Sequence, residues 1–107
     1  MNETIRTEIE AATFRRLLQH LDNHKEVQNI DLMLLADFCR NCLAKWYAAE
    51  AGLRGEKIDY PTAQAIVYGM SYDQWKANYQ TEATPEQLQA LAQRQSRRSP
   101  ATESESQ

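Results

Sequence analysis

Residues 30–51 form the most apolar stretch of the chain, and this stretch constrains the fold more than any other feature. Asp37, Arg40 and Asn41 interrupt it with only a narrow polar stripe. A helix with so narrow a solvent-exposed face is normally central and covered by neighbours on several sides. We therefore predict one uninterrupted central helix over this stretch, preceded by Asn29 as its N-cap.

Shorter helical signals lie on both sides of this stretch. Phe14, Leu17, Leu18 and Leu21 recur at helical spacing and predict an earlier helix with one apolar face, which Ile5 and Ile9 extend upstream. Later helices are predicted from their start and stop signals: Pro61 and Gly69 for one, the Ser71–Gln74 capping box for the next, and Thr84, Pro85 and Gln87 for the last. The chain is therefore predicted to be all-α, a compact array of four to five helices.

The chain of 107 residues is long enough for one domain with one core. We assign residues 1–92 to this helical domain, and residues 93–107, which lack large apolar side chains, to a disordered polar tail. The formal net charge of -3 argues against nucleic-acid and anionic-membrane partners, which attract basic surfaces. No apolar run reaches the roughly 20 residues of a membrane span, and no export signal is visible, so we expect a cytoplasmic protein.

Cys39 and Cys42 stand three positions apart, and two thiols on one helical face can ligate a soft metal ion such as zinc. His20 and His24 share a face in the same way, so the four side chains suggest a zinc site. In an antiparallel helix pair, however, Cys39 and His20 would lie about 10 Å apart along the axis, far beyond Zn–ligand bonds of about 2.0–2.3 Å. A metal site on Cys39, Cys42 and His20 therefore requires crossed helices or two subunits, and we expect no cofactor.

The same cysteine spacing occurs in redox pairs, but those pairs open a helix, where the helix dipole lowers the thiol pKa. Inside a continuous helix, we expect Cys39 and Cys42 to be small buried side chains that pack. Beside them, Asp37, Arg40 and Asn41 form the polar stripe, and Asp37 can pair with Arg40. This stripe is an ion pair where helices meet, the solvated edge of the helix, or a site for a polar or anionic ligand.

Aromatic side chains concentrate in the second half of the chain, and the candidates for an interface are Tyr68, Tyr72, Trp75 and Tyr79. Tyr and Trp are enriched at protein interfaces. A base-stacking platform needs basic surroundings, which this acidic chain lacks. We therefore expect these side chains to serve the core and a self-association interface, with Tyr72 and Trp75 partly exposed in the single subunit.

The segment VQNIDLMLLADFCRNCLAKWY and the later IVYGMSYDQWKANYQ resemble a family of short bacterial proteins of unknown function, family 1244. The motifs FCRNCL, WY and VYGM-x-Y-x-x-W carry the resemblance over about residues 12–82. It implies a compact fold of about four helices in an orthogonal array, and such a fold brings no activity or cofactor with it. The family pattern includes a histidine matching His20 but none matching His24. Family members read M-P-Y where this chain has Met70-Ser71-Tyr72.

No phosphate-binding glycine loop, G-x-S-x-G elbow or H-E-x-x-H motif occurs in the chain. We therefore expect a small non-enzymatic protein that binds itself, as a homo-oligomer, or another protein. The alternative is a metal- or thiol-dependent site on the helix face of Cys39 and Cys42, including one shared between subunits.

Overall fold

The structure is a computed structural model that describes residues 1–97, and this part of the chain contains six helices and no strand. The all-α class predicted from the sequence is therefore confirmed. The helices are α1 (Glu3–Asp22), α2 (Asn29–Ala36), α3 (Arg40–Leu53), α4 (Tyr60–Tyr68), α5 (Tyr72–Tyr79) and α6 (Pro85–Ser96). Residues 98–107 of the predicted tail lie outside the described residues.

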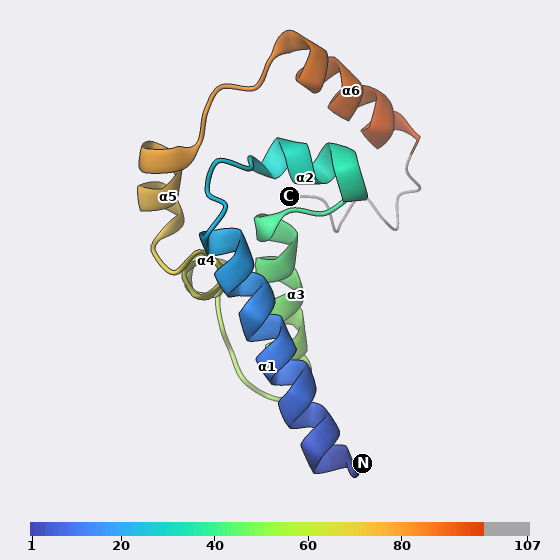
Figure 1. Ribbon diagram of the computed structural model, residues 1–107, viewed down its shortest axis with the longest axis vertical. Coiled ribbons are helices and arrows are strands. Elements are labelled where there is room, and N and C mark those ends of the chain that lie inside the picture. The colour runs from blue at the N-terminus through green and yellow to red at the C-terminus, as the bar shows by residue number, and fades with distance from the viewer. Residues whose placement is uncertain (98–107) are drawn as a thin grey trace.

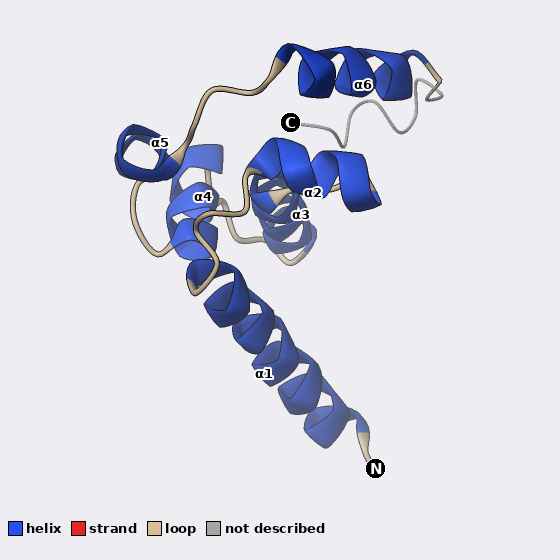
Figure 2. Ribbon diagram, turned by 45° about the horizontal axis from the view of Figure 1, so that its top comes forward, coloured by secondary structure: helices blue, strands red, loops and turns tan. Residues whose placement is uncertain are grey.

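α6, α2 and the start of α3 are stacked one above another (Figures 1 and 2). α3 packs most extensively against α4, α2 crosses above the start of α3, and α6 lies over α2. α1 contacts α4 and reaches α3 through the stacked rings of Phe14 and Tyr47. The main core lies where α1, α3, α4 and α5 meet, around Leu43, Val67 and Trp75. A second, smaller cluster of Met33, Cys39 and Cys42 is buried beneath α6.

The predicted continuous helix over residues 30–51 is wrong, because the chain breaks between α2 and α3. Asp37 ends α2 in the left-handed conformation with φ of 62°, and Cys39 is extended before α3 begins. Aspartate is one of the few residues that adopts this conformation at small cost. Arg94 of α6 donates to the carbonyl of Met33 at 3.3 Å and to Asp37 Oδ1 at 3.2 Å, so a distant helix stabilises the break.

Most local start and stop signals act as predicted. Ser71 and Thr84 cap α5 and α6 with reciprocal capping boxes, and Gly69 ends α4 with φ of 72°. Gly55, with φ of 79°, follows α3, and Glu56 N–H donates back to the carbonyl of Ala51 at 2.9 Å. This pair of features is a glycine C-terminal motif that satisfies carbonyls left free at a helix end.

α1 has two apolar stripes rather than the single one predicted. Phe14, Leu18 and Leu21, the docked stripe, pack against the core. Ile5 and Ile9 do not extend that stripe, because residues five positions apart on a helix differ by about 140° in direction. With Ala12 they form an exposed outer stripe on the opposite side of the helix.

α6 continues through Ser96, beyond the domain boundary predicted at residue 92. This end of the helix has few apolar residues, and its docking is instead polar. Arg94 binds the end of α2, and Gln87 Nε2 donates to Asp31 Oδ1 at 2.9 Å. Leu91 adds the apolar contact that covers the cysteine cluster.

Candidate functional site

The break between α2 and α3 places both cysteines at the start of a helix. Cys39 is the N-cap residue of α3 and Cys42 lies in its first turn, where Cys42 N–H donates to the Cys39 carbonyl at 3.0 Å. Both are free thiols, 0% and 1% exposed, packed with Met33 under Leu91. The predicted burial of the thiols is correct, but the predicted position inside a helix is not.

The two thiols contact one another, and this contact is the main cause that shifts the pKa of Cys39. A hydrogen bond with Cys42 and then burial raise the pKa of Cys39 far above the usual thiol range. Backbone N–H groups of Cys42 and Asn41 act in the opposite direction and lower this pKa, as expected at a helix start. The raising effects dominate, so the buried Cys39 thiol stays protonated at neutral pH.

Arg40 is buried and structural rather than part of a solvated stripe. Its guanidinium donates to the carbonyls of Val27 at 2.7 Å and His24 at 3.1 Å, and to Asn29 Oδ1 at 3.2 Å. It also lies 4.9 Å from the centre of the Trp75 ring. Burial lowers the pKa of Arg40, but arginine remains protonated in proteins. Arg40 thus ties the loop after α1 to the start of α3.

Asn41 lies inside a second polar network next to Arg40. Its Oδ1 accepts from the Tyr68 hydroxyl at 2.7 Å and from Gln64 Nε2 at 3.1 Å, and Asn29 Nδ2 donates to the same hydroxyl at 2.9 Å. Burial is the main cause that raises the pKa of Tyr68, so the hydroxyl stays protonated. Within residues 1–97, every buried side-chain nitrogen and oxygen has a hydrogen-bond partner.

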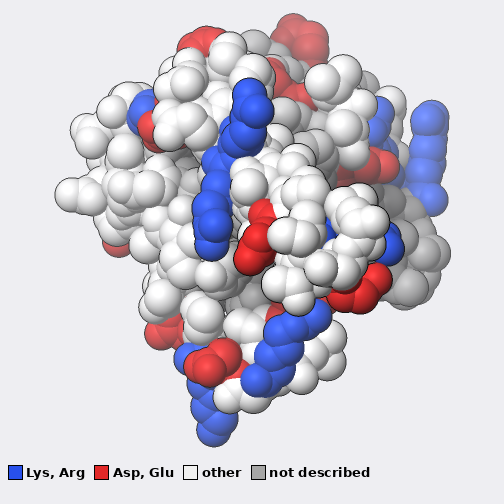
Figure 3. Space-filling view, turned by 60° about the horizontal axis from the view of Figure 1, so that its bottom comes forward, with Lys and Arg blue, Asp and Glu red and all other residues white. Residues whose placement is uncertain are grey.

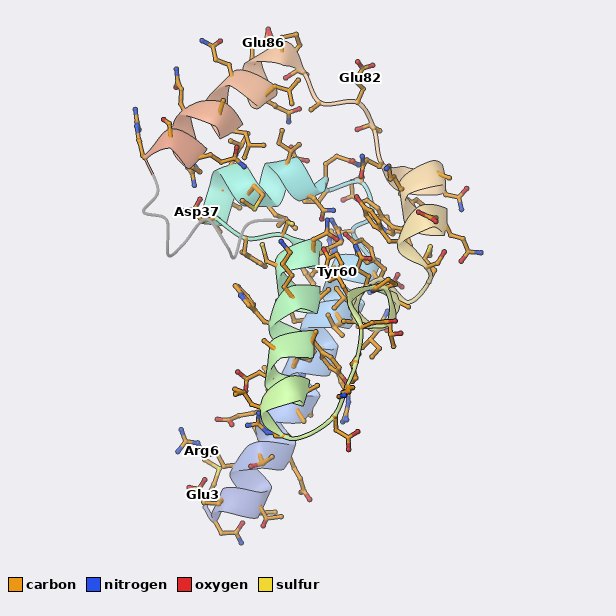
Figure 4. The ribbon with its side chains drawn as sticks, turned by 180° about the vertical axis from the view of Figure 1, so that it is seen from behind. Glu3, Arg6, Asp37, Tyr60, Glu82 and Glu86 are labelled. Carbon is orange, nitrogen blue, oxygen red and sulfur yellow. The ribbon has the colours of Figure 1, made fainter. Side chains whose placement is uncertain are left out.

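The three predicted ligand-binding residues therefore do not converge on one site. Asp37 is exposed at the turn beneath α6, where it pairs with Arg94 instead of Arg40 (Figure 4). Arg40 and Asn41 use their polar atoms on neighbouring helices and loops. They position the start of α3, including both cysteines, and do not face a solvent-filled cavity with Asp37.

His20, the third predicted metal ligand, lies on the exposed side of α1. Its ring contacts His24, with centroids 4.4 Å apart, and its carbonyl faces His24 Nδ1 at 2.8 Å. Across residues 1–97, no three His, Cys, Asp or Glu side chains are grouped so that they could hold a metal ion. The single chain does not assemble His20 with Cys39 and Cys42.

The predicted interface aromatics are part of the core. Tyr68 and Trp75 are 3% and 2% exposed, and their ring centroids lie 5.1 Å apart. Tyr72 and Tyr79 are partly buried and continue this cluster on either side. The expected partial exposure of Trp75 is wrong, because Trp75 closes the core against Tyr68 and Arg40.

The sequence reasoning missed the outer stripe of α1 and the cover formed by Leu91 and Arg94. The outer stripe was detectable, since counting positions from Ile9 to Phe14 places them on different sides of a helix. The roles of Leu91 and Arg94 had no local signal. Both depend on α6 folding back over α2, a contact between segments far apart in the sequence.

Residues 27–93 match a protein family described as "Protein of unknown function (DUF1244)". No curated protein matches the chain. Among residues 1–97, no helix combines the length and hydrophobicity needed to span a bilayer. The match includes the break, the cysteine pair, Arg40 and most of α6, and it covers more than half of the sequence. The chain therefore belongs to the DUF1244 family of proteins of unknown function.

Proposed function

We propose that the protein is a non-enzymatic binding module that acts as a homodimer, joined through the outer stripe of α1. The observation that carries this proposal is the pair of opposite stripes on α1. The docked stripe is covered by the protein's own core, and the outer stripe has no cover within residues 1–97. Ile5 and Ile9 are 45% and 49% exposed. An apolar stripe that faces away from its own fold is typical of a protein interface.

The free half of α1, residues 3–12, has little of its own to stabilise it. It points away from the other helices, and the side chains of Glu3 and Arg6 extend from its end (Figure 4). The side-chain contacts that support it are local, such as the Asn2 cap on Ile5 N–H at 2.8 Å and the Arg6–Glu10 ion pair at 3.2 Å. Short helices without tertiary packing are marginal in water, so this half gains most from a partner.

The charges on α1 favour a second copy as that partner. The free half carries three glutamates and one arginine, and residues 13–22 carry two arginines and one aspartate. An antiparallel pair sets each acidic half beside the basic half of the other copy. When a two-fold axis relates the two copies near the middle of α1, Ile9 meets the partner's Ala12 and Glu8 meets the partner's Arg15.

Beyond the outer stripe, Arg16 and Gln19 continue the same side of α1 and are also exposed, so the main body does not cover that side. Acidic and basic side chains are interspersed on the face in Figure 3, which brings the free end of α1 forward, and neither sign dominates it. Because the stripe is short, we expect a dissociation constant of roughly micromolar order. A cytoplasmic location is part of the proposal, supported by the two free thiols.

Sedimentation over a concentration series tests the dimer. The wild-type chain should move from its 12.4 kDa monomer to twice that mass. Ile9→Asp should weaken association at least about tenfold, because the charge is buried twice in a symmetric interface. Leu35→Asp is the matched control, since Leu35 is also apolar and 82% exposed but lies on α2. A monomer at every concentration, or dissociation caused equally by Leu35→Asp, would overturn the proposal.

A further inference from the structure

The break between α2 and α3 gives the cysteine pair a geometry that a continuous helix denies it. In a helix interior, side chains three positions apart have Cβ atoms about 5–6 Å apart, and a disulfide needs about 3.5–4.5 Å. An extended N-cap residue instead turns its side chain back toward the third residue of the helix. Cys39 has that extended backbone, with φ of -146°, and its thiol already contacts Cys42.

We propose that Cys39 and Cys42 form a reversible disulfide in exchange with low-mass disulfides such as oxidised glutathione, and that α6 is the cover that controls access to them. This inference is independent of the proposed dimer, since the cysteines and α6 lie at the opposite end of the molecule from the free half of α1 (Figure 1). It concerns the same residues that the sequence alone assigned to packing.

Three polar contacts and one apolar side chain hold the cover in place. Arg94 binds the Met33 carbonyl and Asp37, and Gln87 binds Asp31. Leu91 alone from α6 packs against the cysteine cluster, and Leu88, one turn earlier, is 55% exposed. An element attached by so few buried contacts opens at low free energy compared with global unfolding.

Opening of α6 changes the chemistry of the thiols as well as their accessibility. In the closed state, the hydrogen bond with Cys42 and then burial raise the pKa of Cys39. Water that enters after α6 lifts removes the contribution of burial, while the N–H groups of Cys42 and Asn41 continue to lower this pKa. The fold thus protects the pair while it is closed, and opening makes the Cys39 thiol easier to ionise.

The exchange proceeds in two balanced steps. The Cys39 thiolate attacks one sulfur of oxidised glutathione, forming a mixed disulfide and releasing one glutathione. Cys42, after losing its proton to solvent, attacks the Cys39 sulfur, forms the intramolecular disulfide and releases the second glutathione. Two electrons pass from the cysteines to oxidised glutathione, and the two released thiolates take up the two protons.

Intact-mass analysis of the folded, full-length chain in oxidised glutathione tests this proposal. The wild type should lose the mass of two hydrogen atoms and regain it with excess dithiothreitol, without becoming a covalent dimer. Leu91→Ala should speed this change about tenfold by easing the opening of α6. Leu88→Ala, on the same helix but away from the cysteines, should leave the rate unchanged. Cys42→Ser should stop at a glutathione adduct.

Two results would overturn the inference. In the first, the wild type and Leu91→Ala both stay reduced while circular dichroism shows them folded, and the guanidinium-unfolded chain oxidises. In the second, Leu88→Ala accelerates oxidation as much as Leu91→Ala does, so that access does not depend on the cover over the cysteines. Sedimentation of the same samples separates either result from the fate of the dimer.

Discussion

At the scale of single residues, Arg40 is the side chain on which the candidate site depends most. One guanidinium donates to the carbonyl of Leu21 at the end of α1 and to those of His24 and Val27 in the following loop, and it packs on Trp75. Asn41, the next residue of α3, is joined to α4 because its Oδ1 accepts a hydrogen bond from the Tyr68 hydroxyl. The residues between the two cysteines thus fix the position of the whole start of α3.

Replacing Arg40 by Met should lower the free energy of unfolding by about 3 kcal/mol or more. The apolar side chain fills the space but leaves the part-buried carbonyl of Val27 without a donor, at about 1–3 kcal/mol. It also removes charged hydrogen bonds to the His24 carbonyl and to Asn29 Oδ1, at about 1.5–3 kcal/mol for each, although the Val27 N–H still donates to the His24 carbonyl. Arg54→Met removes an exposed pair with Glu50 and should cost under about 1 kcal/mol. Urea denaturation of both variants measures the difference, and similar losses in the two would contradict the structural role of Arg40.

At the scale of helices, the break at Asp37 separates this fold from the one that the sequence pattern predicts. A continuous helix would leave the cysteines in a helix interior, and the break moves them to a helix start. Asp37→Gly and Asp37→Ala test it, because both variants lose the pair with Arg94 and differ only in backbone preference.

The glycine variant should be the more stable of the two by about 1 kcal/mol, because the left-handed conformation is strained for alanine. If residues 30–51 formed one helix, alanine would instead be favoured by about 1 kcal/mol. The sign of this difference, measured by chemical denaturation, distinguishes the two structures. Greater stability of the alanine variant would contradict the break.

How far the sequence predicts these elements depends on how local their causes are. The starts of α5 and α6 and the glycine ends of α3 and α4 were predictable, because Ser71, Thr84, Gly55 and Gly69 act within one helical turn. The break was not, since residues 37–39 contain neither glycine nor proline. It is stabilised by Arg94, which lies 57 positions after Asp37.

In the molecule as a whole, α1 combines a docked half with a free half. The free half lies outside the residues that match the family. The sequence shows the periodicity of the docked stripe, and helical spacing across residues 9–14 places the outer stripe on the opposite side. The burial of the aromatic cluster could not be read locally, since Tyr68 and Trp75 meet Arg40 only in the folded chain.

The antiparallel arrangement makes a specific prediction about charge. Glu8→Arg and Arg15→Glu should each weaken the dimer, because each places like charges opposite one another in both copies. The double variant restores opposite charges and should recover most of the wild-type affinity at low salt. Sedimentation at matched concentrations measures all four chains. No recovery in the double variant would contradict antiparallel pairing through this face.

Amide hydrogen exchange in the free half of α1, followed over a range of protein concentrations, measures whether a second copy covers the outer stripe. Without a partner, this half is a short helix exposed to water, so its amides should exchange quickly in dilute samples. As copies associate, protection of residues 3–12 should rise with concentration, and protection around Trp75 should stay constant. Rapid exchange in residues 3–12 at every concentration would contradict the claim that a second copy covers the outer stripe.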